Sequence, residues 1–424
     1  MSRRALSPLL AVLIAVPAPV FAAEFAVVQS AAPTVNSTNQ DFTSSGFGTP
    51  KCSLHWASYG TANGTSVSHA GFGIGAYDGT REFSMFAASE NGVAPMDTGS
   101  LVDTNAALAT LATADQTQNG ETTASFITDG VRFAWADAPP SAYLINTLLV
   151  GGSGVSDCYV GQATGNATQD ATTVVSAPGF QPDIIIAWAN NAVSTHMRPS
   201  YGMAWRNGGS IVQRALGFND TDANATSSVQ SILATDRVMV NAVAGQAQLE
   251  VTSFDASGFT ITTRDAAAAR TITYMAIKLS GLSAFLHTSA APTATGDQAI
   301  TGVGFRPQVG LMLQGEFAAV DTLYSASDGE VFGFSVFTEG QSASSAVWAN
   351  DGAGTSGTDS LTDTKVCATR KDSAAYATCT LSSFDSDGAT YNYTATNGTA
   401  RQRAVLYVQT SAASSNMMLR RRNQ

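Results

Sequence analysis

Charged and titratable residues are scarce in this sequence. Asp, Glu, Lys and Arg make up only 12% of its 424 residues, and there are four lysines and four histidines. The chain also lacks the motifs of metalloproteases, phosphate-binding loops and hydrolase nucleophiles. Catalysis depends on titratable groups that can be brought together, so we predict a protein that is not an enzyme. A secreted hydrolase is the disfavoured alternative.

Positive charge is in particularly short supply. The 21 Lys and Arg residues face 32 Asp and Glu, and five of these cations lie within residues 1–22 and 411–424. The acidic body repels phosphate backbones, which predicts no nucleic-acid partner. The basic residues of the C-terminal tail, 411–424, would either touch an anionic surface or simply stay in solvent.

Long apolar runs are missing except near the N-terminus. Arg3 and Arg4 precede an apolar stretch over 5–20, and Val20, Phe21 and Ala22 follow the small-residue pattern of a signal-peptidase site. The stretch contains three prolines and is shorter than the roughly 20 residues that a spanning helix needs. We therefore predict a signal peptide at 1–22 and no membrane span in the mature chain. The predicted location is secreted: extracellular, or on a cell or virion surface.

Cysteine is rare, but its even count predicts disulfides in an exported chain. Cys367 and Cys379 flank a polar centre, and a hairpin over this stretch would place them opposite each other at disulfide distance. Cys52 and Cys158 fall in different repeats of the sequence. They would form either a staple between repeats or two buried thiols.

The abundant Thr, Ser, Ala, Gly and Asn are organised in a threefold repeat. A GF turn precedes an apolar run three times, in GFGTPKCSLHW, GFQPDIIIAW and GFRPQVGLML, and the heptapeptides SFITDGV, SFDASGF and SFDSDGA follow further on. A period of about 130 residues suits a domain and not a solenoid unit. We predict domains at 23–152, 153–282 and 283–410, packed side by side, each with its own core. The four histidines take non-equivalent positions in these repeats.

The recurring heptapeptide predicts a hairpin turn. In the second copy, the Asp255 carboxylate would accept a hydrogen bond from a backbone N–H two residues on, and Gly258 would take a positive φ. Gly130 and Gly388 are the equivalent turn glycines. Apolar and polar residues alternate after each glycine, which is the pattern of a strand.

Helix signals are weak throughout, so strands dominate the predicted fold. Counting about eight strands per repeat, we predict an all-β protein of three tandem antiparallel β-sandwich domains, jelly-roll-like, after the signal peptide.

Ligand and metal candidates lie in the predicted loops. Paired carboxylates, Asp220 with Asp222 and Asp385 with Asp387, would bind Ca²⁺, or they would serve the backbone of their turns. No other cofactor is expected. Tyr201, Arg206 and Asn207 are the candidate contacts to a ligand.

The succession of GF-x-P, an apolar strand, SFD-x-x-GF-T and a terminal apolar strand resembles a β-sandwich repeat of uncharacterised phage virion proteins and bacterial surface proteins. The resemblance implies a fold and an exposed setting. Our first hypothesis is a non-enzymatic surface recognition or adhesion protein that contacts glycans or a surface receptor through sandwich-end loops. The second is a structural subunit of a virion or extracellular filament, whose partners would be copies of itself.

Overall fold

The computed structural model describes residues 24–114, 116–190, 195–243, 245–246, 248–265, 268–325, 329–371, 374–396 and 398–409. The predicted signal peptide at 1–22 and the basic tail at 411–424 lie outside the described residues. Every regular element in the described part is a strand, and every paired strand is antiparallel. The predicted all-β, antiparallel class is therefore confirmed.

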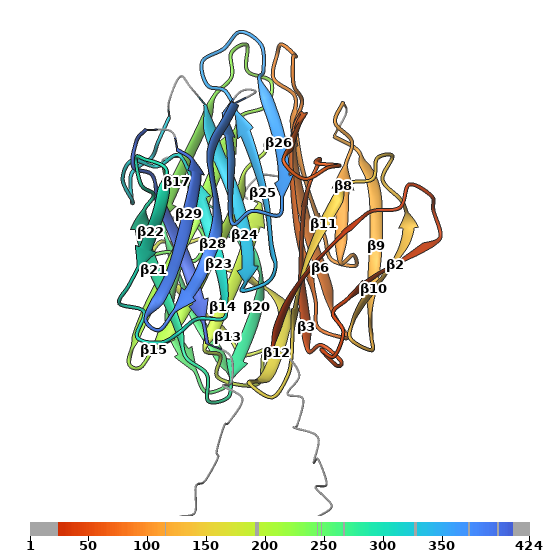
Figure 1. Cartoon of the computed structure of the whole chain (residues 1–424). Helices are drawn as coiled ribbons and strands as arrows, with labels where there is room; N and C mark the ends of the chain where they lie inside the picture. Colours follow the sequence, from red (N-terminus) through yellow and green to blue (C-terminus); the bar gives the residue numbers. More distant parts are fainter. Residues whose placement is uncertain are drawn as a thin grey trace, which may run out of the picture.

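The strands form three pairs of sheets (Figure 1). In the first pair, the inner sheet has the order β1 (Phe25–Ala31), β11 (Leu144–Val150), β3 (Cys52–Ser58), β5 (Ala70–Tyr77), β6 (Glu82–Ser89), β7 (Thr98–Asp103). The outer sheet has the order β2 (Thr38–Thr43), β10 (Gly130–Asp137), β9 (Gln118–Ile127), β8 (Leu108–Leu111).

The second and third pairs repeat this order. The second has the inner sheet β12 (Val155–Thr164), β20 (Thr271–Leu279), β14 (Ile184–Asn190), β15 (Pro199–Asn207), β16 (Ser210–Asp220), β17 (Val229–Ala234), and the outer sheet β13 (Thr172–Val175), β19 (Gly258–Arg264), β18 (Gln248–Asp255). The third has the inner sheet β21 (Ala284–Ala290), β30 (Gln402–Val408), β23 (Val309–Gly315), β24 (Glu330–Thr338), β25 (Ser342–Ala349), β26 (Thr358–Asp363), and the outer sheet β22 (Gly296–Ile300), β29 (Gly388–Ala395), β28 (Ala374–Asp385), β27 (Cys367–Lys371). A further strand from the first repeat, β4 (Thr65–Ser68), extends the third inner sheet beyond β26.

The strand order differs in detail from the prediction. Each inner sheet contains a four-stranded meander, such as β14–β15–β16–β17, and in the first sheet only β4 interrupts the sequence of its strands; a regular jelly roll is built instead from two Greek keys. The pairs also hold more than the eight strands expected, because several short strands carry too few residues to show a period of two.

Each inner sheet is buried on both faces. Along β14, Ile184, Ile186 and Trp188 point into a core shared by all three sheet pairs, whereas Ile185 and Ala187 point into the core of their own pair. An unbroken apolar run is typical of a strand covered on both sides. This explains why the sequence reads IIIAW here instead of alternating.

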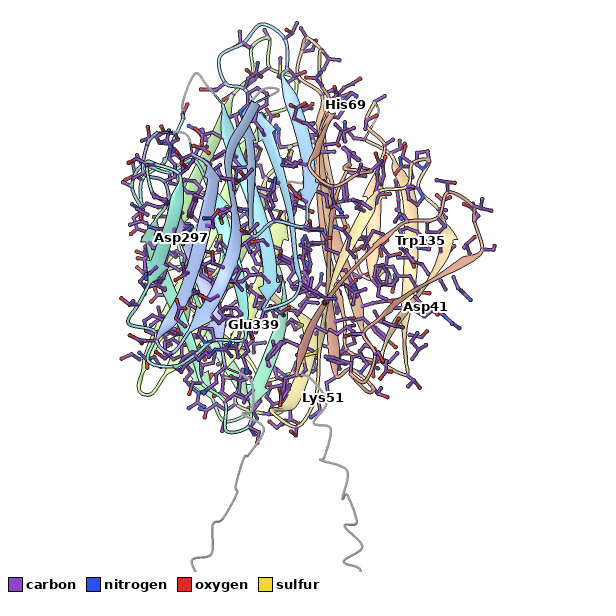
Figure 2. The ribbon with its side chains drawn as sticks, viewed as in Figure 1. Asp41, Lys51, His69, Trp135, Asp297 and Glu339 are labelled. Atoms are coloured by element: carbon purple, nitrogen blue, oxygen red, sulfur yellow. A yellow bond between two sulfur atoms is a disulfide. The ribbon has the colours of Figure 1, made fainter. Side chains whose placement is uncertain are left out.

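The three pairs therefore surround one common core, in addition to the separate cores between paired sheets. Trp135 lies in one of these separate cores, between the two sheets of the first pair (Figure 2). We expected only separate cores, because the sequence gives no sign that the second face of the inner sheets is covered by neighbouring repeats. The domain boundaries predicted at 152/153 and 282/283 stay a prediction.

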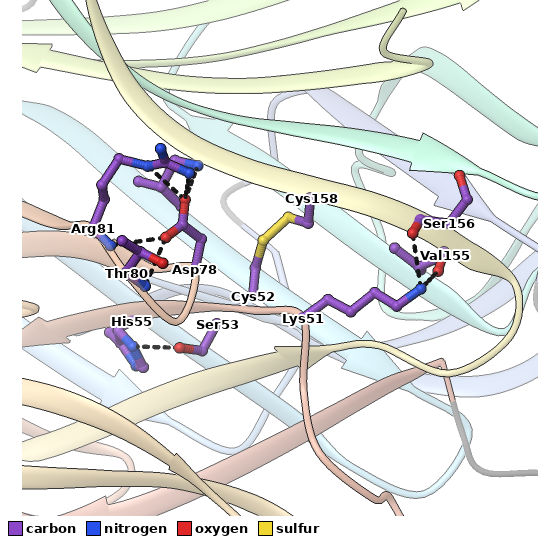
Figure 3. Close-up of a disulfide and its surroundings, with 11 residues drawn as sticks. Lys51, Cys52, Ser53, His55, Asp78, Thr80, Arg81, Val155, Ser156 and Cys158 are labelled. Atoms are coloured by element: carbon purple, nitrogen blue, oxygen red, sulfur yellow. Dashed lines mark hydrogen bonds and ion pairs between the residues drawn. A yellow bond between two sulfur atoms is a disulfide. The ribbon is translucent and has the colours of Figure 1, made fainter. Parts of the chain in front are cut away.

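A disulfide between Cys52 and Cys158 joins the first pair to the second, with 6.1 Å between the Cα atoms (Figure 3). Beside it, the Lys51 ammonium donates to the carbonyl oxygens of Val155 and Ser156. The second disulfide, Cys367–Cys379, joins directly opposite residues of β27 and β28. The structure thus contains both of the bonds considered from the sequence.

The recurring turn glycine is required by a close approach and not, as predicted, by a positive φ. Of the three glycines only Gly388 has a positive φ, of 150°. A Cβ on Gly130, Gly258 or Gly388 would lie 2.0, 1.8 or 1.9 Å from the carbonyl oxygen of the neighbouring strand. Only glycine avoids this collision, so each copy keeps it.

The aspartate of the heptapeptide also acts differently from the prediction. Asp255 accepts hydrogen bonds from the hydroxyls of Ser253 and Thr260, both at 2.7 Å, instead of from a backbone N–H. Asp385 repeats this arrangement with Ser383 and Thr390. The Ser, Asp and Thr of SFD-x-x-GF-T therefore lock the hairpin across its two strands.

Both ends of the described chain and both joints between repeats lie at one end of the molecule (Figure 1). There the last strand of each repeat returns to its first: the backbone N–H of Gly151, Ser280 and Gln409 donate to the carbonyls of Glu24, Gly154 and Ser283 at 2.8–2.9 Å. We call this the chain end, and the opposite end the loop end.

Candidate recognition surface at the loop end

Three equivalent loops close the loop end as a ring. We define this loop ring as residues 89–98, 220–229 and 349–358, which connect the fifth and sixth strands of each inner sheet. Each loop exchanges two backbone hydrogen bonds with the next: Met96 with Ala223 and Asn224, Ser227 with Gly352 and Ala353, and Ser356 with Gly92 and Val93, at 2.7–3.0 Å. The ring is therefore cyclic, and every repeat has the same role in it.

Backbone conformation and side-chain hydrogen bonds hold the three loops of the ring in place. Gly92, Ala223 and Gly352 all have positive φ, between 59° and 81°. The side chain just before each of these three residues accepts a hydrogen bond from a backbone N–H of another loop: Asn91 from Thr358, Asp222 from Thr98, and Asp351 from Val229, at 2.8–3.1 Å. The residues most exposed on the ring are small and uncharged, such as Ala94, Thr226 and Thr355. The ring thus holds the repeats together and presents small, uncharged side chains at the loop end.

Two histidines stand at equivalent positions behind the ring, which corrects the prediction that all four are non-equivalent. Nδ1 of His69 accepts the backbone N–H of Asn91, and Nδ1 of His196 accepts that of Asp222, at 3.0 and 2.9 Å. Burial lowers the pKa of both imidazoles. His69 lies near the loop end in Figure 2, far from Lys51 and Glu339. The repeat was obscured because the connections before these histidines differ in length.

Those connections, 59–69, 191–198 and 316–329, join the third and fourth strands of the inner sheets and decide what fills the crevices between repeats. In the crevice between the third and first pairs, β4 pairs with β26. In the crevice between the second and third pairs, Tyr324 pairs with Ser231 of β17, and the Asp321 carboxylate accepts the backbone N–H of Thr235 at 2.6 Å. Both connections thereby cover the edge of a neighbouring inner sheet.

In the third crevice, between the first and second pairs, the described residues leave a groove. Its connection, 191–198, is the shortest of the three, and its described part meets β7 near the loop end, where the Thr98 hydroxyl donates to the Thr195 carbonyl at 3.0 Å. Below this contact lies a groove of about 350 Å³, lined by Met85 and Val102 of the first pair and by Gln162, Trp188, Arg270 and Thr273 of the second. We call it the interrepeat groove.

Two other hollows are less suited to recognition. One of about 390 Å³ lies beside Tyr59 and Tyr143, but the Tyr59 hydroxyl already donates to the Leu111 carbonyl at 2.9 Å. Another, of about 530 Å³, lies between β1 and the turn at Glu339, towards the chain end, and has no aromatic lining.

The candidate ligand contacts chosen from the sequence do not form a site. Tyr201 is fully buried in the shared core, with its ring centroid 4.5 Å from that of Phe334, so this prediction is wrong. Its strand, β15, begins earlier than the sequence suggests. Arg206 is paired with Asp183, and Asn207 occupies an exposed hairpin turn near the chain end.

The carboxylate pairs considered for Ca²⁺ are engaged with the protein. Asp387 accepts the N–H groups of Gly302 and Gly304, which lowers its pKa, and the two oxygens of Asp385 accept hydroxyls as described above. Asp222 holds the loop ring, and Asp220 is buried and accepts the Ser89 hydroxyl at 2.6 Å. Among the residues that the structure describes, no group of three or more His, Cys, Asp or Glu side chains is arranged to hold a metal ion.

Comparisons of the chain with protein-family models, curated proteins and solved structures gave no match. The resemblance to repeats of virion and bacterial surface proteins therefore stays a prediction. Within the described part of the chain, no helix has the length and apolar character needed to cross a membrane.

Proposed function

We propose that the protein is a secreted, non-enzymatic surface recognition or adhesion protein that contacts its target with the loop end and the adjoining side of the molecule. The observation that carries this proposal is the separation of the two ends. The chain end gathers the ends of the described chain and both joints, which suits attachment, and the loop end points away from it (Figure 1). Two disulfides fit an extracellular protein.

The covered sheet edges support recognition over assembly into a filament. An uncovered edge strand offers backbone groups to another chain. Here β26 and β17, which end the third and second inner sheets, are met by β4 and by Tyr324 of neighbouring repeats. A filament built by joining inner sheets at β26 or β17 would have to displace these contacts.

The alternative, a structural subunit of a virion or filament, is favoured by the outer sheets. The strands β2, β13 and β22 each end an outer sheet, with no further strand paired to them in the described residues. Val174 of β13 is 69% exposed, which is unusual for a large apolar side chain in this molecule. Addition of a strand from a second copy would cover it.

The two functions are separated by binding and light-scattering measurements on the mature protein. We expect the monomer to bind a glycan array or whole cells, and Thr355→Arg on the loop ring to weaken binding. Ser257→Arg, in an exposed turn at the chain end, is the matched control and should leave binding unchanged. No binding to the glycan array or to cells, together with an apparent mass from light scattering that rises with protein concentration, would instead favour the structural subunit.

A further inference from the structure

We propose that the interrepeat groove binds an acidic saccharide, with Arg270 pairing with its carboxylate. This inference rests on the proposed recognition function and adds the class of ligand. It starts from a break in the threefold repetition: two crevices are covered by their own connections, whereas the described residues of the third leave a groove within the 300–1,000 Å³ range of small-molecule sites.

The corresponding arginine in a covered crevice shows what Arg270 lacks. Just before β30, Arg401 pairs with Glu316 at 3.0 Å, and its guanidinium lies 5.6 Å from the centroid of the Tyr324 ring. Both partners belong to the connection 316–329. Just before β20, Arg270 donates to the Gln246 amide oxygen at 3.1 Å but forms no ion pair with any described residue. Its charge is available to an anion from outside the chain.

The groove is locally positive in an acidic protein. Burial lowers the pKa of Arg198, and the positive charge of Arg270 lowers it further. None of the residues that line the groove is Asp or Glu. A planar guanidinium matches a carboxylate in geometry as well as in charge.

The groove also has hydrogen-bond donors without acceptors. Nε of Arg270 and Nε1 of Trp188 are buried, and neither has a hydrogen-bond partner among the described residues. Trp56, the equivalent of Trp188, has the same unpartnered N–H inside the shared core, so this indole alone does not define a site. Trp188 differs because it borders the groove, next to the unpartnered Arg270 N–H.

The remaining lining suits a sugar ring. Gln162 and Thr273 are joined by a 3.3 Å hydrogen bond and offer amide and hydroxyl groups to sugar hydroxyls. On the opposite wall, Val102 is 47% exposed and presents apolar surface to the C–H face of a pyranose, whereas its cross-strand neighbour Met85 is almost fully buried. A cation, neutral polar groups and an apolar wall together favour a uronic-acid type of ligand over a bare anion.

The test is a titration of the mature protein with D-glucuronate, followed by calorimetry or by saturation-transfer NMR, with D-glucose as the neutral probe. We expect glucuronate to bind and glucose to bind at least about tenfold more weakly, because a charged hydrogen bond is lost. Arg270→Gln should weaken glucuronate binding by about tenfold or more. Arg264→Gln, which removes an outer-sheet arginine paired with Glu250, should not change it.

A second pair of variants tests the position of the site without changing charge. Val102→Trp should block the groove and abolish glucuronate binding, whereas Val174→Trp, at a more exposed valine on β13, should leave it intact. Equal affinity for glucose and glucuronate, displacement of glucuronate by an equimolar amount of sulfate, or full binding by Val102→Trp would overturn the proposal. Array or cell binding that survives in Arg270→Gln would reject the groove but retain the recognition function.

Discussion

Replacing Asp220 by Asn should make the protein more stable at pH 8 but not at pH 4. Asp220 is 1% exposed at the end of β16, with its Oδ2 accepting the Ser89 hydroxyl and its Oδ1 left without a partner. Burial, with smaller contributions from Asp351 and Asp222, raises the pKa of this carboxyl from 3.8 to about 7. Asn keeps the shape and an acceptor for Ser89 but cannot ionise.

The magnitude follows from the proton that the folded protein retains. Between about pH 4 and pH 7 the folded state keeps a proton on Asp220 that the unfolded chain has released, so the free energy of unfolding falls as the pH rises. Each pH unit contributes about 1.4 kcal/mol. The shift from 3.8 to about 7 therefore predicts a loss of up to about 4 kcal/mol at pH 8, which Asp220→Asn should restore.

His55 acts in the opposite direction, so the wild-type pH profile alone is not diagnostic. Burial lowers the pKa of His55 to about 3. Between pH 3 and 6.5 the unfolded chain gains a proton that the folded state excludes, and stability rises with pH. Both proteins contain His55, so its effect cancels in the difference between Asp220→Asn and wild type.

Urea denaturation of both proteins from pH 4 to pH 8 is the appropriate assay. We expect the difference in unfolding free energy to be close to zero near pH 4 and to grow towards pH 7. A constant difference across this range, or a variant that is less stable at pH 8, would refute the assignment of a buried, protonated carboxyl.

Two further predictions concern the repeated architecture. Gly258→Ala should lower the free energy of unfolding by about 3 kcal/mol, because its Cβ would meet the Val175 carbonyl oxygen at 1.8 Å. The control variant Gly209→Ala, whose Cβ would have no atom within 4 Å, should change the denaturation midpoint little. Equal effects of the two substitutions would contradict the close-approach argument. Replacing both Cys52 and Cys158, which are 106 residues apart, by serine should lower the free energy of unfolding by about 4 kcal/mol in the same assay. The loss should exceed that from removing the second disulfide, which spans 12 residues. The reverse order would show that the two disulfides do not stabilise the fold through loop closure.

The sequence predicts strands and turns here better than it predicts packing. The repeated heptapeptide located each hairpin because its glycine and, in the second and third copies, its Ser, Asp and Thr depend on residues close in sequence. Tyr201 was misplaced because its burial depends on Phe334, which belongs to another repeat. The position of Trp188 and Arg270 in one groove likewise depends on how two repeats meet.

The groove likewise had no signature of its own in the sequence. The useful signal was the unequal length of the connections 59–69, 191–198 and 316–329, which becomes visible only once His69 and His196 are aligned. A difference between copies is therefore the place to look for function in a repeated chain, because what all copies share is explained by the fold.

Linking the three repeats in one chain permits such differences. Ser89, Asp220 and Ala349 occupy equivalent positions, opposite Thr98, Val229 and Thr358. A trimer of identical chains would have to place the same side chain at all three positions, and three buried carboxyl groups would repel one another wherever they ionise. In the linked chain a single carboxyl is tolerated beside a serine and an alanine. By the same freedom, the three connections differ in length, and the described residues of one crevice leave a groove while the shared core and the loop ring keep their threefold form.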